Sequence, residues 1–234
     1  MRVWVWIPAR GGSQSIPRKN IRMMGQHPLI AYSIIYAKQF DFVEKILVST
    51  DDEEIASIAI QYGAELACNT LRPAHLAGNY TRDEEVLDYI VRHYESINQV
   101  PDWWVQLRPT YPFRPMNLLR ELYETFMLNE TTHAVRTIVK SEHPPMKMYR
   151  MDRNRLVPLF QSWEDVNAPY EAPRQLLPTC YWHNGCIDII KHSTFLEHRT
   201  CFPTDLVIGY EMDRKETWDI DTEEDWKLVM KQFT

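Results

Sequence analysis

Residues 2–20, RVWVWIPARGGSQSIPRKN, decide the fold class that we predict for this chain. The first part, residues 2–7, is a short continuous apolar run of the kind found in buried parallel strands. A loop of small and basic residues, 8–20, follows it directly. Open α/β sheets bind their ligands at the carboxyl ends of the strands. The order of these two parts therefore predicts an α/β fold in which the loop faces a ligand.

Strands and helices alternate at short spacing from this segment to residue 139. Apolar runs predict further strands at 45–50, 103–107 and 134–139. Apolar periodicity and end signals predict helices at 28–39, 52–62, 81–96 and 115–128. Gly63 ends the second helix, and Thr81 with Glu84 fits a capping box at the start of the third. This alternation predicts a mostly parallel sheet with helices on both faces.

The composition changes beyond residue 140, where prolines become frequent. We expect two short strands within 146–160 around a turn at 152–154, and extended chain or loop at 161–181. Strands return at 186–190 and 206–210, and a final helix occupies 223–233. We therefore predict a single domain, 1–234, with an insertion at about 141–182 on one edge of the sheet. Such an insertion is suited to substrate contacts or to a subunit interface.

Bulk properties exclude several classes of protein. The net charge of −6 argues against nucleic acid as a partner. No apolar run approaches the roughly 18 to 20 residues that span a bilayer, and the chain opens on a strand rather than a signal peptide. The four cysteines, Cys68, Cys180, Cys186 and Cys201, lack metal-type spacing and are expected to be free thiols. We expect a soluble cytoplasmic protein that binds no membrane and no nucleic acid.

The loop after the first strand has the residue types of a phosphate-binding site. Gly11 and Gly12 let the backbone approach a ligand closely, and exposed N–H groups cradle phosphates. Arg10, Arg18 and Lys19 add full charges. The loop fits neither a Walker A pattern nor G-x-G-x-x-G. The alternative is a tight basic surface loop with no ligand.

Two carboxylates near the C-terminus, Asp219 and Asp221, are separated by one residue in WDIDTEED. In extended backbone they point the same way, and they suit one Mg²⁺ beside a polyphosphate. The alternative is a helix start, with Asp221 as the N-cap and Glu224 completing a capping box. Both interpretations are compatible, because Asp219 precedes the cap.

Two further segments carry candidate polar contacts. Residues 106–114, QLRPTYPFR, follow a strand as a polar loop stiffened by proline. Residues 171–175, EAPRQ, contain Arg174, whose guanidinium suits a carboxylate or a phosphate. The alternative for both is an ordinary connection with surface arginines. His183 and the other histidines show no ligand pairing.

Taken together, these segments resemble the acylneuraminate cytidylyltransferase family. The resemblance runs in order along nearly the whole chain, through IPARGGSQSIPRKNI, VSTDDEEIA, RPAHLA, VQLRPTYPFR, HPPMK, PRQ with Y-x-x-NG, and DIDTEED. It implies a Rossmann-like nucleotidyltransferase fold and a homodimer in which one subunit's insertion helps to build its partner's sugar site. It also implies Mg²⁺-dependent transfer of CMP from CTP to a sialic-acid-like nonulosonic acid, with release of pyrophosphate.

The resemblance also implies roles for individual residues. The nucleotide would be held by Ala9, Arg10, Gly11, Gly12, Ser13, Lys19, Asn20, Arg72 and Asp83. The anionic sugar would be held by Gln106, Arg108, Thr110, Lys147, Arg174, Gln175, Asn184 and Asp188. The metal would be bound by Asp219 and Asp221, which would form the catalytic set together with Arg10 and Lys19.

Three departures from the family pattern leave the substrates open. The family has Lys-Gly where this chain has Gln14-Ser15. Asp83 stands where members often carry Ser or Thr, and it suits either the amino group of cytosine or the N1–H and amino group of guanine. Asp188 replaces a tyrosine and suits an amine. The alternatives are therefore an NTP:sugar-1-phosphate nucleotidyltransferase, for example with GTP and an amino sugar phosphate, or a catalytically weakened nucleotide-binding homologue.

Overall fold

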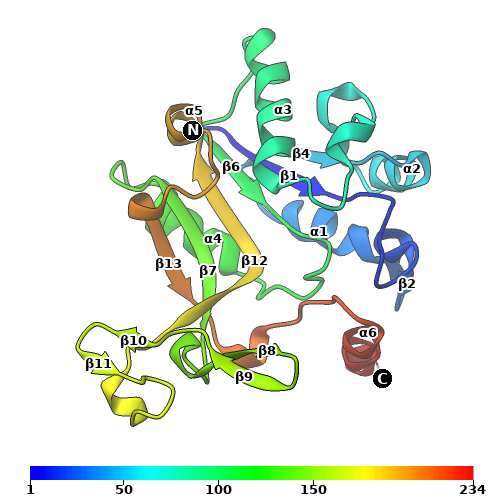
Figure 1. Ribbon diagram of the computed structural model, residues 1–234. Helices are drawn as coiled ribbons and strands as arrows, with labels where there is room; N and C mark the ends of the chain where they lie inside the picture. The colour runs from blue at the N-terminus through cyan, green and yellow to red at the C-terminus, as the bar shows by residue number, and fades with distance from the viewer. Residues whose placement is uncertain (234) are drawn as a thin grey trace.

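A seven-stranded sheet forms the centre of the computed structural model, which describes residues 1–233. The strand order is β13-β7-β12-β6-β1-β4-β5 (Figure 1). The strands are β1 (Val3–Pro8), β4 (Val43–Ser49), β5 (Glu65–Leu66), β6 (Trp103–Gln106), β7 (Ala134–Lys140), β12 (Tyr181–Lys191) and β13 (Val207–Glu211). Only β12 among them is antiparallel to its neighbours, β6 and β7. The predicted α/β fold with a mostly parallel sheet is confirmed.

Helices cover both faces of this sheet. They are α1 (Leu29–Ala37), α2 (Glu53–Gln61), α3 (Asp83–Ser96), α4 (Leu118–Leu122), α5 (His192–His198) and α6 (Glu223–Met230). Side chains alternate along β1, so Val3 and Val5 pack with α1, α2 and α4, whereas Trp4 and Trp6 pack with α3 and α5. Helix α6 belongs to a third, smaller cluster with residues of the loop after β1.

Some predicted boundaries were wrong in detail. Both capping boxes lie one residue later than predicted. The Glu85 carboxylate accepts from the N–H of Arg82 at the start of α3, and Thr222 with Asp225 caps α6. The helix predicted at 115–128 is α4 followed by a π-helix, Tyr123–Met127. Gly63 follows α2 with φ +91°, as expected of the glycine that ends a helix.

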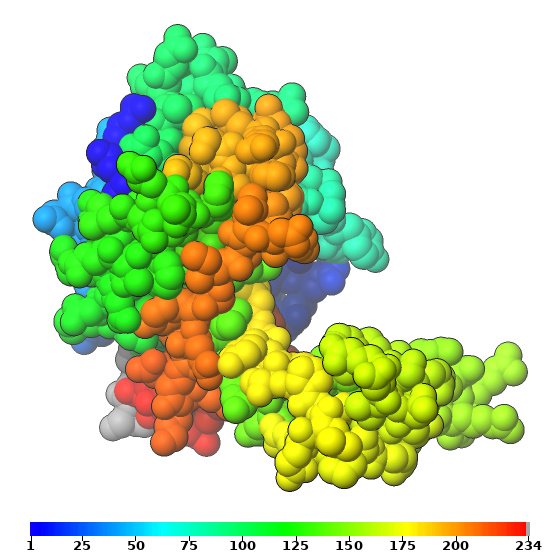
Figure 2. All heavy atoms as spheres, turned by 90° about the vertical axis from the view of Figure 1, so that its left-hand side faces the viewer, coloured from blue at the N-terminus to red at the C-terminus, as the bar shows by residue number. Residues whose placement is uncertain are grey.

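Residues 141–180 form an arm between β7 and β12 that projects from the body (Figure 2). It contains the hairpin β8 (Tyr149–Asp152) and β9 (Arg155–Pro158), and the short pair β10 (Ser162–Trp163) and β11 (Val166–Asn167). Arg153 and Asn154 make the β8–β9 turn with positive φ, as the predicted turn requires. Large apolar side chains on this arm are exposed, among them Met151 at 70% and Leu156 at 64%.

Short elements complete the chain. The pair β2 (Met23–Met24) and β3 (His27–Pro28) precedes α1. Single 3₁₀ turns lie at Lys19–Ile21, Ala67–Asn69, Ala74–Leu76, Pro145–Lys147, Arg174–Leu176, Thr204–Leu206, Arg214–Glu216 and Lys231–Phe233. The four cysteines are free, as predicted. Through residue 233, the helices are too short or too polar to cross a membrane.

Candidate active site

A cavity of about 290 Å³ lies at the carboxyl ends of β1 and β6, where the ligand site was predicted. It is lined by Pro8, Arg10, Ser13, Lys19, Asn20, Arg72, Leu76, Gly78, Asn79, Thr81, Asp83, Val86, Arg108, Pro109 and Thr110. Eight residues proposed from the sequence thus meet in one place: Arg10, Ser13, Lys19, Asn20, Arg72, Asp83, Arg108 and Thr110. The parallel sheet explains this, because it brings the ends of strands distant in sequence to one edge.

The loop after β1 is held by hydrogen bonds from its own backbone. The N–H of Gly11 donates to Asp51 Oδ1 at 2.9 Å, and the Asn20 side chain donates to the carbonyl of Arg10, also at 2.9 Å. A Cβ at Gly11 would lie 2.8 Å from the carboxylate of Asp52, so only glycine fits here. Ala9 is buried in the core and, like Gly11 and Gly12, is absent from the cavity lining. Their contact with the nucleotide, which the family resemblance implies, stays a prediction.

Two cations of this loop, Arg10 and Lys19, line the cavity. Arg10 Nη1 donates to Asn79 Oδ1 at 2.6 Å, and across residues 1–233 it forms no ion pair. Lys19 Nζ donates to the carbonyl of Ile220 at 2.9 Å and lies 3.6 Å from the exposed carboxylate of Asp221. Arg18 differs, because its guanidinium pairs with Asp52 and Glu54 and does not line the cavity. A phosphate group would therefore meet Arg10 and Lys19.

The carboxylates of Asp219 and Asp221 lie beside Lys19. Burial and the charge of Asp221 raise the pKa of Asp219, although a hydrogen bond from Thr110 opposes this. Burial and the neighbouring negative charge thus both disfavour the charged form of Asp219, and a bound cation would favour it. In the described part of the chain no group of three or more His, Cys, Asp or Glu is arranged around one point. Two carboxylate ligands fit Mg²⁺, which keeps several waters and takes phosphate oxygens.

Helix α6 holds this carboxylate pair in place. Ile220, between the two aspartates, is buried and its N–H donates to the carbonyl of Thr110 at 2.9 Å. Trp226 of α6 stacks against the guanidinium of Arg22, 4.4 Å from the ring centre, and Arg22 also pairs with Glu223 at 2.6 Å. These contacts join the C-terminal carboxylates to the first loop, over 200 residues away in sequence.

Arg72 is buried and lines one side of the cavity. Its Nε donates to Ser49 Oγ at 3.0 Å, and Nη2 donates to the carbonyl of Ser49 at 2.5 Å. Burial lowers the pKa of Arg72, an effect that the charges of Asp51 and Asp83 oppose. The guanidinium therefore fixes the segment after β5 against β4. Part of the Arg72 side chain still lines the cavity.

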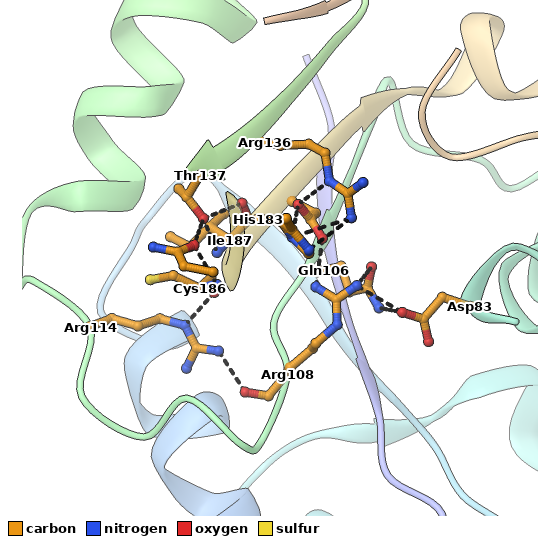
Figure 3. Close-up of polar contacts among 11 residues, drawn as sticks. Asp83, Gln106, Arg108, Arg114, Arg136, Thr137, His183, Cys186 and Ile187 are labelled. Atoms are coloured by element: carbon orange, nitrogen blue, oxygen red, sulfur yellow. Dashed lines mark hydrogen bonds and ion pairs between the residues drawn. The ribbon is translucent and has the colours of Figure 1, made fainter. Parts of the chain in front are cut away.

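Arg108 links both of the unusual carboxylates (Figure 3). Its Nη2 lies 2.8 Å from Asp83 Oδ2, and its Nη1 lies 2.5 Å from Asp188 Oδ2. Gln106 also donates to Asp83 Oδ2, at 2.8 Å. The buried Arg114 donates to the backbone carbonyl of Arg108 at 2.8 Å and fixes that residue from behind.

Asp188 is 1% exposed and does not face the cavity. Besides Arg108 it accepts from Arg136 Nε at 3.2 Å and from His183 Nε2 at 2.9 Å. Burial alone would raise the pKa of Asp188, but the hydrogen bond from His183 and the charges of Arg108 and Arg136 hold it well below its usual range. The expectation that Asp188 meets an amine of the sugar is wrong, since three cationic or polar side chains already surround it.

The other residues proposed for the sugar are not brought to this cavity. Asn184 is buried and accepts from the Thr137 hydroxyl at 2.7 Å, which makes it part of the core. Lys147 donates to the carbonyl of Ala172 at 2.7 Å within the arm. Arg174 lines a separate cavity of about 340 Å³ at the base of the arm, and Gln175 is exposed beside it. Gln106 is buried and reaches the cavity only through Asp83.

Sequence reasoning missed three residues of the site. Asn79 holds Arg10, while Arg136 and His183 hold Asp188. Strand alternation places Arg136 opposite Asp188 in the β7–β12 register, but no sequence signal gives that register. The sequence shows no ligand pairing for His183. Its partner is Asp188, which lies on the other side of a bulge in β12.

Known proteins resemble this chain along its whole length. The model of a family described as cytidylyltransferase matches residues 4–152, more than half of the chain. A pseudaminic acid cytidylyltransferase from Campylobacter jejuni is 31% identical over 95% of this chain and 92% of its own length. A CMP-N,N'-diacetyllegionaminic acid synthase from the same species is 32% identical over 95% of this chain and 91% of its own length.

The fold agrees with a solved structure. That of CMP:2-keto-3-deoxy-manno-octonic acid synthetase complexed with CTP matches with a TM-score of 0.68, covering 100% of this chain and 98% of the other at 16% identity. The resemblance seen in the collinear motifs is confirmed by these matches. The chain belongs to the cytidylyltransferase family and is a nucleotidyltransferase.

Proposed function

We propose that the protein is a Mg²⁺-dependent cytidylyltransferase that joins CMP from CTP to a nonulosonic acid. The observation that carries the proposal is the meeting of cations and carboxylates at the loop after β1. Arg10 and Lys19 line the cavity, Lys19 lies 3.6 Å from the carboxylate of Asp221, and Asp219 lies within electrostatic range of both Lys19 and Asp221. Cations suit the phosphates, and the carboxylates suit their metal ion. The relatives named for pseudaminic and legionaminic acids support the sugar class.

The reaction depends mainly on the alignment of its two substrates, and it needs no covalent intermediate with the protein. A hydroxyl oxygen of the sugar attacks the α-phosphorus, the new P–O bond forms as the bond to pyrophosphate breaks, and the hydroxyl proton passes to solvent. Arg10 and Lys19 would orient the phosphates and balance the charge that develops on them. A bound Mg²⁺ would supply further charge neutralisation to the leaving pyrophosphate. No side chain is assigned as a general base.

The acidic sugar requires cations beyond those of one cavity. Lys147 and Arg174 lie in or at the base of the arm and do not line the cavity of their own subunit. We propose that a second copy brings them to it, in a homodimer built on the arm. The exposed apolar side chains of the arm, such as Met151 and Leu156, support an interface there.

The dimer has a direct test in solution. Met151→Asp with Leu156→Asp should shift the protein from dimer to monomer in sedimentation velocity. The matched control is Ile60→Asp, since Ile60 is 56% exposed on α2 of the body. A double variant that remains a dimer would refute an interface on this hairpin.

The alternative substrates lose support. GTP with an amino sugar phosphate was motivated by Asp83 and Asp188, of which Asp188 is buried among cationic side chains. A silent homologue was motivated by Gln14, but this residue is exposed and lies outside the cavity lining, where Arg10 and Lys19 remain. CTP use is also in keeping with the cytoplasmic location expected from the sequence.

The function is tested by measuring pyrophosphate release. The protein would be incubated with each of the four NTPs, Mg²⁺ and a panel of nonulosonic acids and sugar 1-phosphates. We expect release with CTP and a sugar acid, and its loss when EDTA removes the metal ion. Release only with a sugar 1-phosphate, or only with another NTP, would refute the proposal.

A further inference from the structure

The network of ion pairs around Arg108, at one end of the cavity, carries no net charge. Asp83 and Asp188 supply two negative charges, and Arg108 and Arg136 supply two positive ones. Each guanidinium –NH₂ group of Arg108 already faces a carboxylate. A sugar carboxylate placed here would meet Asp83 as a like charge rather than a free cation. Arg108 is therefore poorly suited to the role of carboxylate ligand that the sequence suggested.

The same contacts orient Asp83. Both hydrogen bonds that it accepts, from Gln106 and from Arg108, end on Oδ2 at 2.8 Å. Within the described residues, Oδ1 accepts none, and the side chain is 41% exposed where it lines the cavity. Asp83 thus presents one oxygen to a ligand while the other is fixed. Figure 3 shows Arg108 and Gln106 pointing at one side of this carboxylate.

The surroundings of Asp83 suit a nucleobase. Val86 lies three residues further along α3, on the same face as Asp83, and it lines the cavity together with Leu76. The base is the flat apolar part of a nucleotide, so it would pack on these side chains while the phosphates lie by Arg10 and Lys19. This arrangement places the edge of the base near Asp83 Oδ1.

We propose that Asp188, Arg108 and Asp83 form a relay that presents one fixed carboxylate oxygen to the exocyclic amino group of the base. This inference rests on the proposed function. Cytosine offers an amino donor at this position and uracil offers an acceptor, which a carboxylate would repel. Guanine offers two adjacent donors, whereas Asp83 has one free oxygen. Asp188 acts through Arg108, so it is a positioning residue for base selection.

The test compares dissociation constants for CTP, UTP and GTP, measured by calorimetry with Mg²⁺ and no sugar. We expect the wild-type protein to prefer CTP to UTP by roughly ten- to a hundredfold, the worth of one hydrogen bond to a charged group. Asp83→Asn should remove most of this preference, because its amide can donate to uracil. Asp188→Asn should reduce the preference by a smaller factor while leaving Asp83 present.

Controls separate base selection from general damage. Asp88→Asn changes a carboxylate on the same helix that pairs with Arg92 and Arg199 outside the cavity, and it should keep the wild-type preference. If Asp188 were merely structural, Asp188→Asn would lower the melting temperature without changing the CTP/UTP ratio. Should Asp83→Asn not fold, Asp83→Ser removes the same charge.

The outcomes distinguish this inference from the function on which it rests. If Asp83→Asn kept the wild-type ratio of CTP to UTP affinity, the relay would be overturned while CTP use would remain intact. Preference of the wild-type protein for GTP would also overturn it, since one oxygen cannot satisfy guanine. Failure of the wild-type protein to bind any of the three nucleotides would defeat the proposed function itself.

Discussion

The two ends of the cavity both hold basic side chains, but these differ in how far carboxylates neutralise them. At the first loop, Arg10 lacks an ion pair and Lys19 lies 3.6 Å from one exposed carboxylate. At the other end, Arg108 is held between Asp83 and the buried Asp188. A phosphate is bound most favourably where positive charge is not already paired. The difference therefore indicates the direction of the nucleotide in the cavity more clearly than the number of basic residues does.

The comparison also separates two roles of buried charge. A paired network such as Asp188 with its three partners fixes geometry, because each member is satisfied by the protein itself. A group such as Asp219, whose pKa is raised by burial and by Asp221, is stabilised further when a cation binds beside it. Removing a member of the first kind should cost stability, whereas removing one of the second kind should cost activity.

The largest expected effect is on stability and comes from Asp188→Ala. Removing the buried carboxylate leaves Arg136 without its ion pair and Arg108 with Asp83 as its one remaining carboxylate, so the free energy of unfolding should fall by about 3–5 kcal/mol. Urea unfolding followed by circular dichroism measures it. Asp205→Ala removes an exposed aspartate that forms no ion pair within residues 1–233, and it should leave stability nearly unchanged. Equal changes in the free energy of unfolding for the two variants would show that the buried network around Asp188 does not stabilise the fold more than an exposed residue does.

The pKa of Asp188 adds a pH signature to this variant. Because its folded-state pKa is depressed, the carboxylate stabilises the fold fully above its unfolded pKa of about 3.9 and loses this contribution as the pH falls further. Wild-type stability should therefore drop more steeply than that of Asp188→Ala below about pH 4. Parallel curves in acid would show that Asp188 is not the group that titrates.

The second effect is on turnover. Asp219→Asn keeps the size of the side chain but removes a metal ligand, so kcat should fall by about 10²- to 10³-fold, as on loss of one electrostatic contact in a transition state. The melting temperature should stay close to that of the wild-type protein. Asp205→Asn is the matched control. Full Mg²⁺-dependent turnover in Asp219→Asn would show that the carboxylate pair only starts helix α6.

The sequence predicted the strands of the body well, because their signals are local. The apolar run at residues 2–7 and the runs at 45–50 and 103–107 correspond to β1, β4 and β6 within two residues at each end. Helix α5 gave no comparable signal, since it is seven residues long and its first turn has no capping side chain. The arm was recognised from its prolines, but its exposed apolar side chains depend on what the rest of the chain leaves uncovered.

The residues that line the cavity were predicted from several segments, whereas the pairing of side chains behind it was not. Arg10, Lys19 and Asn20 share a loop, and the sheet edge brings them to the cavity as expected. Asp188 was misjudged, because its partners Arg108 and Arg136 lie 80 and 52 residues away and are set by strand register. A lone aspartate beside a substrate motif looks the same in sequence whether it faces the ligand or lies beneath it.

The third prediction compares a free arginine with a paired one in the same loop. Arg10→Ala should raise the KM for CTP roughly tenfold, because a charged hydrogen bond to phosphate is lost. Arg18→Ala should change it little, since Arg18 is held by Asp52 and Glu54. Steady-state kinetics with saturating sugar measures both. A larger effect at Arg18 than at Arg10 would mean that Arg18 leaves its partners to bind CTP.

The smallest effect is expected at Gln14, the position where the family carries lysine. Gln14 is exposed and does not line the cavity. A charge placed there would act on the phosphates through water, where such interactions contribute about 0 to 1 kcal/mol and are screened within about 8 Å at physiological salt. Gln14→Lys should therefore lower the KM for CTP by no more than about fivefold. Gln14→Glu should raise it by a similar factor.

The salt dependence of the KM for CTP shows whether residue 14 acts on the phosphates at long range or by direct contact. If residue 14 acts only through long-range charge, the difference between Gln14→Lys and Gln14→Glu should shrink as NaCl is added, while the effect of Arg10→Ala persists because Arg10 contacts the ligand directly. The KM for CTP across a series of NaCl concentrations provides the measurement. A marked loss of activity in Gln14→Lys at every salt concentration would mean that the loop has been reshaped around glutamine. The phosphate end would then owe its binding properties to loop geometry rather than to the charges of Arg10 and Lys19 alone.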